Sequence, residues 1–140
     1  MMDIHQPLVQ IRDLTIRFGR KTVVDHLNLE ISAGERFAIV GESGSGKTLT
    51  GLSLIGLLPE SAQVSGQVDL IRGGQVLDVV KLASSELRSI RGKDVSIIFQ
   101  EPMTALNPLY TIGNQIIEAV QCHEPLLSYA QAKDLSLIHI

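Results

Sequence analysis

The amino-acid sequence predicts an α/β fold with an antiparallel β subdomain at its N-terminal end. Three observations support this prediction. Apolar residues alternate with polar ones in two stretches before residue 32, as in half-exposed strands. The run Phe37–Val40 is apolar without alternation, which is typical of a strand covered on both faces. A glycine-rich loop and a helical apolar stripe follow that run, so the order is strand, loop, helix.

Composition narrows the class of protein further. The chain has 140 residues, of which 44% are hydrophobic and 19% charged, a balance typical of a soluble α/β domain. The formal charge of -3 provides no basic surface for nucleic acid, so no nucleic-acid partner is expected. Cys122 is the single cysteine, which excludes an internal disulfide framework, and we expect it to be buried. The start of the chain does not resemble a secretory leader, and no apolar stretch approaches the ~20 residues of a membrane-spanning helix.

The first two strands are predicted from alternation. Apolar residues recur nearly every second position from Leu8 to Phe18, and Arg12-Asp13 shifts the phase as a bulge would. Residues 19–21 supply a turn, and apolar residues alternate again from Leu27 to Ile31. These two stretches are expected to pair as antiparallel strands.

The elements after the glycine-rich loop are predicted from periodicity and turn residues. One apolar stripe spans Leu49 to Leu58 and stops at Pro59, which predicts a helix. Residues 64–71 and 76–80 flank 72–75 and indicate a hairpin. A short helix capped by Ser84 or Ser85 should run through Ile90, and Asp94–Phe99 should form another buried strand. Residues 112–120 are predicted as helix, and helical character persists through 128–134.

The loop 41–48 reads Gly-Glu-Ser-Gly-Ser-Gly-Lys-Thr, and each fixed position has a mechanical reason. Glycines at 41, 44 and 46 permit positive φ and leave no Cβ in the way, so successive N–H groups can turn inward around phosphate oxygens. Lys47 can reach the β- and γ-phosphates, and Thr48 offers a hydroxyl to Mg²⁺. Glu42 is better explained as an exposed loop residue than as a general base. The predicted nucleotide contacts in this region are Gly41, Glu42, Ser43, Gly44, Ser45, Gly46, Lys47, Thr48 and Leu49.

With residues 97–108, which read Ile-Ile-Phe-Gln-Glu-Pro-Met-Thr-Ala-Leu-Asn-Pro, the loop supports a family resemblance. From Leu8 to Val120 the chain resembles the ATP-binding cassette subunits of membrane transporters. The second stretch is similar to the Q-loop segment of the dipeptide, oligopeptide, nickel and glutathione importer branch. The resemblance implies a P-loop NTPase (RecA-like) core behind the antiparallel β subdomain, with ATP and Mg²⁺ as cofactors, within a partial nucleotide-binding domain spanning residues 1–140.

The resemblance also implies roles for particular residues. Phe18 would stack on the adenine ring, although a core aromatic in a strand is the alternative. Gln100 would reach Mg²⁺ and the attacking water. The predicted catalytic residues are therefore Lys47 and Gln100, and the predicted Mg²⁺ contacts are Thr48 and Gln100. Residues 101–109 would form part of the surface that meets the membrane-embedded subunit.

Partners and location follow from the resemblance as well. It implies transmembrane permease subunits, a second ATP-binding subunit as a homo- or heterodimer, and an extracytoplasmic solute-binding protein. The chain would lie peripherally on the cytoplasmic face of the inner (plasma) membrane. The solute is not readable from this chain, because in such systems the other subunits select it.

The printed sequence departs from the family at its C-terminal end. In the family, a Leu-Ser-Gly-Gly-Gln signature, a strand ending in Asp-Glu and a switch histidine follow downstream, and this sequence contains none of them. We therefore expect an amino-terminal fragment that binds ATP but does not hydrolyse it, since the Asp-Glu pair holds the Mg²⁺ shell and polarises water. The apolar tail 135–140 is interpreted as a segment that does not belong to the natural protein.

Two other functional classes remain open from the residues. A non-catalytic nucleotide-binding or interaction module from a truncated gene would also retain the phosphate contacts. A phosphate-loop kinase or other transferase would need an arginine-rich lid over its acceptor. The segment 58–94 contains only three arginines, and residues 97–108 also argue against this last class.

Overall fold

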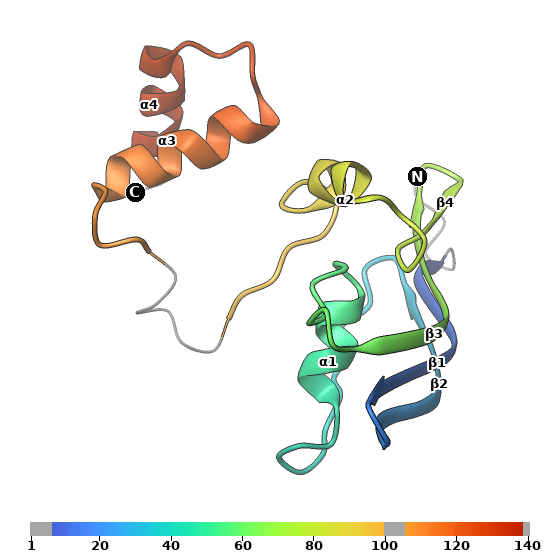
Figure 1. The fold of residues 1–140 in the computed structure, drawn as a ribbon. Helices are drawn as coiled ribbons and strands as arrows, with labels where there is room; N and C mark the ends of the chain where they lie inside the picture. Colours follow the sequence, from blue (N-terminus) through green and yellow to red (C-terminus); the bar gives the residue numbers. More distant parts are fainter. Residues whose placement is uncertain (1–6, 100–105, 139–140) are drawn as a thin grey trace. The chain divides into compact units, whose positions relative to one another are not determined.

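The computed structural model describes residues 7–99 and 106–138, with the side chains of 136–138 excepted. The chain divides into two compact units, Met1–Val95 and Ser96–Ile140, and each is described by itself. Figure 1 shows a sheet with two short helices in the first unit and a pair of helices in the second.

The first unit is built on a four-stranded sheet in the order β2-β1-β3-β4, and every neighbouring pair is antiparallel. Its strands are β1 (Pro7–Phe18), β2 (Lys21–Ser32), β3 (Gln63–Arg72) and β4 (Gln75–Asp78). The predicted N-terminal strand pair and the later hairpin are both confirmed. The hairpin turns at Gly73-Gly74, whose φ angles of +54° and +84° suit a tight turn that favours glycine.

The predicted bulge in the first strand is also confirmed. The register of β1 shifts between Ile11 and Leu14 against β2, and Asp13 has a φ of +54°. The Asp13 N–H donates to the side chain of Asn28 at 2.9 Å. On the other side, the Asp13 carbonyl approaches Gly66 so closely that a Cβ there would lie 2.4 Å from its oxygen. The bulge is therefore held from both neighbouring strands.

The core of the first unit lies on one face of this sheet. β1 contributes its centre, since Leu14 and Ile16 are fully buried. The buried apolar cluster consists of Ile11, Leu14, Ile16, Val24, Val68, Leu70, Val79 and Ile90. Six of these residues lie on β1, β2 and β3, and all eight belong to the first unit, so the sheet is the main part of that unit's core.

The helices are α1 (Lys47–Ser53), α2 (Ser84–Ile90), α3 (Ile112–His123) and α4 (Tyr129–Ile138). The prediction that the first of them continues to Leu58 is wrong. Gly56 adopts a φ of +62°, and the N–H of Leu57 bonds back to the Leu52 carbonyl at 2.9 Å, which closes the helix early. The predicted serine cap of α2 is wrong too, because Ala83 precedes the helix and its N–H donates to the Glu86 carboxylate at 2.8 Å.

The two buried strands expected at 37–40 and 94–99 are not formed. Val40 is 93% exposed and Ile98 is 98% exposed. Buried strands need a neighbour along each edge to bond their N–H and C=O groups. Among the described residues neither segment is paired with a neighbouring strand. The second segment has only an isolated β-bridge, between Val95 and Arg91.

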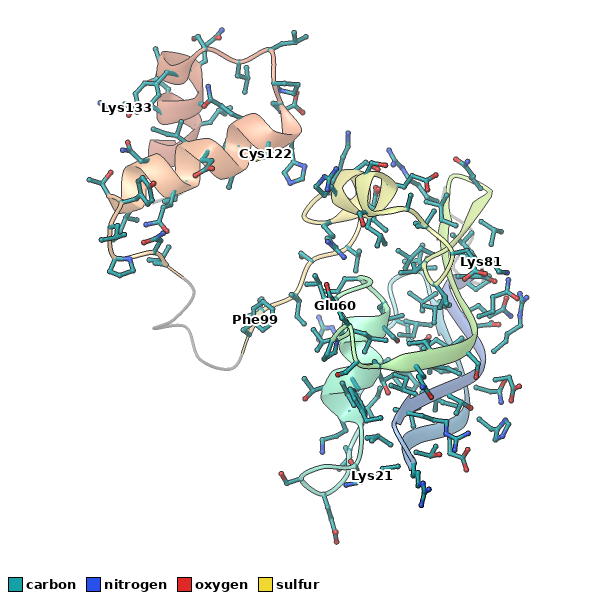
Figure 2. All side chains as sticks on the ribbon, viewed as in Figure 1. Lys21, Glu60, Lys81, Phe99, Cys122 and Lys133 are labelled. Atoms are coloured by element: carbon teal, nitrogen blue, oxygen red, sulfur yellow. The ribbon has the colours of Figure 1, made fainter. Side chains whose placement is uncertain are left out.

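The second unit is a pair of packed helices. Ile117 of α3 and Ala132 of α4 are buried, and the hydroxyl of Tyr129 donates to the side chain of Asn114 at 3.1 Å. Both predicted helices are confirmed and run further than expected, so that α4 includes the first part of the apolar tail. Cys122 lies on α3 (Figure 2) and is exposed, so the expectation that it is buried is wrong.

Candidate phosphate-binding loop

The glycine-rich loop joins the segment 37–40 to α1. Gly44 and Gly46 adopt φ angles of +83° and +89°, in the left-handed region that glycine tolerates best. Gly41 does not have a positive φ, contrary to the prediction. Glycine is needed at this position because there is no room for a side chain. A Cβ at Gly41 would lie 2.8 Å from the Ser45 hydroxyl, so a larger residue would fill the concave side of the loop.

Lys47, the first residue of α1, crosses the loop. Its ammonium donates to the Gly41 carbonyl at 2.8 Å, to the Glu42 carbonyl at 2.6 Å and to the Ser45 hydroxyl at 3.3 Å. A half-buried cation thus lies over the concave side of the loop, held by neutral oxygens rather than by a carboxylate. Such a charge is available for an anion, because exchanging a carbonyl for a phosphate oxygen strengthens each hydrogen bond.

The loop is anchored to the sheet and to α1. A Cβ at Gly46 would lie 2.9 Å from the Val23 carbonyl, so the backbone of the loop rests directly on β2. The Gly46 carbonyl accepts from the N–H of Thr50 at 2.9 Å and from its hydroxyl at 3.1 Å, which joins the loop to the first turn of α1. The loop conformation is therefore set by β2 and α1, and does not depend on a formed strand at 37–40.

A cavity of about 190 Å³ opens on the loop. It is lined by Val23, Gly44, Ser45, Gly46, Lys47, Thr48 and Leu49. Thr48 is exposed, so its hydroxyl is accessible to a hard cation that prefers oxygen ligands. The loop thus combines three features: space that a Cβ at Gly41 would fill, the Lys47 ammonium and the exposed Thr48 hydroxyl. Together they suit the binding of a nucleotide phosphate chain with Mg²⁺.

A second cavity of about 500 Å³ adjoins the first and shares Val23, Ser45 and Lys47 with it. Its other walls come from β2, from residues 37–41 and from Thr50 of α1, and they are mostly apolar. Phe18 is the last residue of β1, is half-buried against the core cluster, and does not line either cavity. Its predicted contact with adenine stays a prediction.

Among the predicted site residues, the structure brings together those of the loop and α1. Gln100 lies outside the described residues, as do residues 101–105, so its predicted role in catalysis and Mg²⁺ binding stays a prediction. Sequence reasoning missed Val23, which lines both cavities. Val23 is one of two adjacent valines in β2, and nothing local distinguishes it, because only the packing of the loop on β2 gives it this position.

A glycine cradle crossed by a lysine at the start of a helix defines the class of P-loop nucleotide-binding proteins. The chain belongs to the ABC transporter family, whose model matches residues 24–138. Membership implies ATPase activity in full-length ATP-binding subunits of this family. The comparison therefore confirms the family that the two motifs predicted.

Curated relatives are transport ATP-binding proteins. The chain is 40% identical over 131 residues to the oligopeptide transport ATP-binding protein OppD of Mycobacterium tuberculosis, covering 91% of this chain and 21% of that protein. It is 42% identical over 124 residues to the glutathione import ATP-binding protein GsiA of Pectobacterium atrosepticum, covering 84% and 20%. It is 40% identical over 144 residues to the dipeptide transport ATP-binding protein DppD of Bacillus subtilis, covering 96% and 42%. The chain thus spans less than half the length of each of these relatives.

Within residues 7–99 and 106–138, no helix has the length and apolar character required to cross a membrane. The same described ranges hold no group of three or more histidine, cysteine, aspartate or glutamate side chains arranged to hold a metal ion.

Proposed function

We propose that this chain is the nucleotide-binding front part of the ATP-binding subunit of an importer for peptides or similar small solutes. The observation that carries the proposal is the position of the Lys47 ammonium across the glycine loop, within 2.8 Å of the Gly41 carbonyl and 2.6 Å of the Glu42 carbonyl. The names of the relatives, which refer to oligopeptide, dipeptide and glutathione transport, support the solute class.

Each residue of the loop has a distinct task in binding. The backbone N–H groups around Gly44 and Gly46 donate hydrogen bonds to phosphate oxygens, because the positive φ angles of these two glycines turn the N–H groups inward. Lys47 gives up its neutral carbonyl partners for the β- and γ-phosphates, and Thr48 contributes its hydroxyl to the Mg²⁺ shell. The bound nucleotide and Mg²⁺ supply the phosphoryl chemistry in the complete subunit.

Hydrolysis requires further groups than this loop. Gln100 is proposed to orient the attacking water, and the Asp-Glu pair that polarises it in the family is not in this sequence. The chain is therefore proposed to bind ATP without turning it over. In the complete system, ATP binding would close two ATP-binding subunits on one another and move the membrane partner.

The assembly is proposed from the same family relation. The complete subunit would lie on the cytoplasmic face of the membrane against transmembrane permease subunits, and an extracytoplasmic solute-binding protein would deliver the solute. The ATP-binding names of the relatives support a subunit that works with separate membrane components. Residues 101–109 remain the proposed contact with those components.

Titration of the purified chain with Mg·ATP, by fluorescence or calorimetry, tests the proposal. We expect saturable binding that Lys47→Ala weakens by at least tenfold, about 1.4 kcal/mol, because the substitution removes the charge that faces the phosphates. Lys93→Ala is the matched control, since Lys93 is an exposed lysine in the turn after α2. Binding that is equal in wild type and Lys47→Ala would contradict the proposal.

The same samples test the catalytic part of the proposal. A phosphate-release assay at saturating Mg·ATP should detect no turnover above the Lys47→Ala background. Sustained release by the wild-type chain would show that this chain contains a complete catalytic set, and the assignment of the catalytic groups would then be wrong.

A further inference from the structure

Helix α1 carries the phosphate loop at its N-terminal end but is too short to be stable alone. It spans the seven residues Lys47–Ser53, whereas isolated helices need roughly 12–15 residues to be even marginally stable in water. Its orientation must come from contacts at both ends. At the N-terminal end, Gly46 rests on Val23. Further along the helix, Thr50 and Ser53 are buried.

The backbone just after the C-terminal end of α1 is bound by a side chain from a distant part of the chain. The Arg91 guanidinium donates from Nε to the Ile55 carbonyl at 2.8 Å and from a terminal nitrogen to the Gly56 carbonyl at 2.7 Å. These carbonyls follow the helix and have no partner in the next turn. A planar guanidinium can bind both oxygens at once, and its positive charge suits the C-terminal end of a helix.

Arg91 is itself fixed to the sheet. It follows α2, where Ile90 is buried in the core cluster, and its own N–H donates to the Leu87 carbonyl at 3.1 Å. Three residues later, Asp94 forms an ion pair with Arg72 at the end of β3 at 2.9 Å. The guanidinium therefore extends from a segment that is anchored on both sides.

We propose that Arg91 is a positioning residue for the phosphate loop. Arg91 lines neither cavity at the loop, so it would act only through α1. Because Lys47 is the first residue of α1, a tilt of the helix moves the ammonium and the loop N–H groups together. The inference rests on the proposed function, since it concerns how the site for nucleotide phosphate is oriented.

Two substitutions at Arg91 and one matched control test the proposal. Arg91→Ala removes both hydrogen bonds, and Arg91→Lys keeps the charge but cannot bind both carbonyls in the same fork. Arg88→Ala is the control, because Arg88 is an exposed arginine on α2, three residues before Arg91. Each variant is titrated with Mg·ATP well below its thermal midpoint, and hydrogen exchange of the amides at 43–48 is measured without nucleotide.

We expect Arg91→Ala to weaken Mg·ATP binding on the order of tenfold, since small displacements of positioned groups cost this much or more. Arg91→Lys should recover part of the affinity, and Arg88→Ala should match wild type. The loop amides at 43–48 should exchange faster in Arg91→Ala. Should Arg91→Ala fail to fold, Arg91→Lys alone decides, with a smaller loss and faster loop exchange expected.

The proposal is overturned if the folded Arg91 variants bind Mg·ATP as wild type does and only their thermal midpoints fall, which would be a purely structural effect. If wild type itself does not bind Mg·ATP, the proposed function fails. The exchange rates at 43–48 still test the positioning in that case, since unchanged loop exchange in the variants contradicts it.

Discussion

The antiparallel sheet and the two segments that were expected to form buried strands behave in opposite ways. Ile16 on β1 is completely buried, whereas Val40 just before the phosphate loop is 93% exposed and Ile98 is 98% exposed. All three are β-branched residues in stretches that favour strands. The difference lies in their partners, since β1 is flanked by β2 and β3, and the other two segments have no paired strand among the described residues.

This difference shows what each kind of strand requires. Antiparallel strands can be joined by short turns, so β1 with β2, and β3 with β4, find a partner within a few residues. Parallel strands need a crossover connection and neighbours that are far away in the sequence. The phosphate loop forms nevertheless, because Gly46 rests on β2 and bonds to Thr50 of α1. Its geometry depends on the sheet and the helix rather than on the preceding segment.

A matched pair of substitutions tests most directly whether the sheet is packed and the segment 37–40 is not. Val68 on β3 is fully buried, and Val68→Ala should lower the free energy of unfolding by about 2 kcal/mol through lost burial and a cavity. Val40→Ala removes the same atoms from an exposed site and should change the free energy of unfolding by less than about 0.5 kcal/mol. Urea denaturation followed by circular dichroism measures both. Equal losses in the two variants would show that the segment 37–40 is packed in solution.

The sequence allowed most of the sheet to be predicted, because alternation and turn residues are local signals. The bulge at Arg12-Asp13 and the Gly73-Gly74 turn were visible in the same way. The unformed strands were mispredicted because an apolar run shows that a segment needs covering and does not show whether a partner is present. The true end of α1 was missed since its apolar stripe continues past Gly56.

The phosphate loop could be located from its motif, but its supports could not. Val23 touches the loop only through the packing of β2, and Arg91 binds the Ile55 carbonyl, just after α1, from 36 residues away in the sequence. Neither residue belongs to a local pattern. Contacts that depend on tertiary packing leave no periodic signal, so the structure was needed to find them.

A smaller effect concerns pH at the edge of the sheet. The exposed His26 has a φ of +47°, and its Nδ1 contacts the Asp13 carboxylate at 2.5 Å, which raises the pKa of His26 above 6.5 through that hydrogen bond and the charge of Asp13. The stabilisation is fully present below the unfolded pKa of about 6.5 and is lost as the pH rises through the higher folded pKa.

Urea midpoints of wild type and His26→Gln between about pH 5.5 and about pH 8.5 measure this effect, since the window spans histidine titration. The advantage of wild type over the variant should shrink as the pH rises. Because both side chains are exposed, the change should be smaller than that of Val68→Ala. An advantage that is constant across this range would contradict the assigned pairing with Asp13.

Amide hydrogen exchange with and without Mg·ATP, in wild type and Lys47→Ala, tests the central claim most directly. That claim is that the antiparallel sheet supports a nucleotide-binding loop although the adjoining strand is not formed. We predict strong protection of β1 and β3 in every sample, fast exchange at 37–40 without nucleotide, and slower exchange at 43–48 only when wild type binds Mg·ATP. Protection at 37–40 equal to that of β1 without nucleotide, or a loop whose exchange Mg·ATP leaves unchanged in wild type, would contradict it.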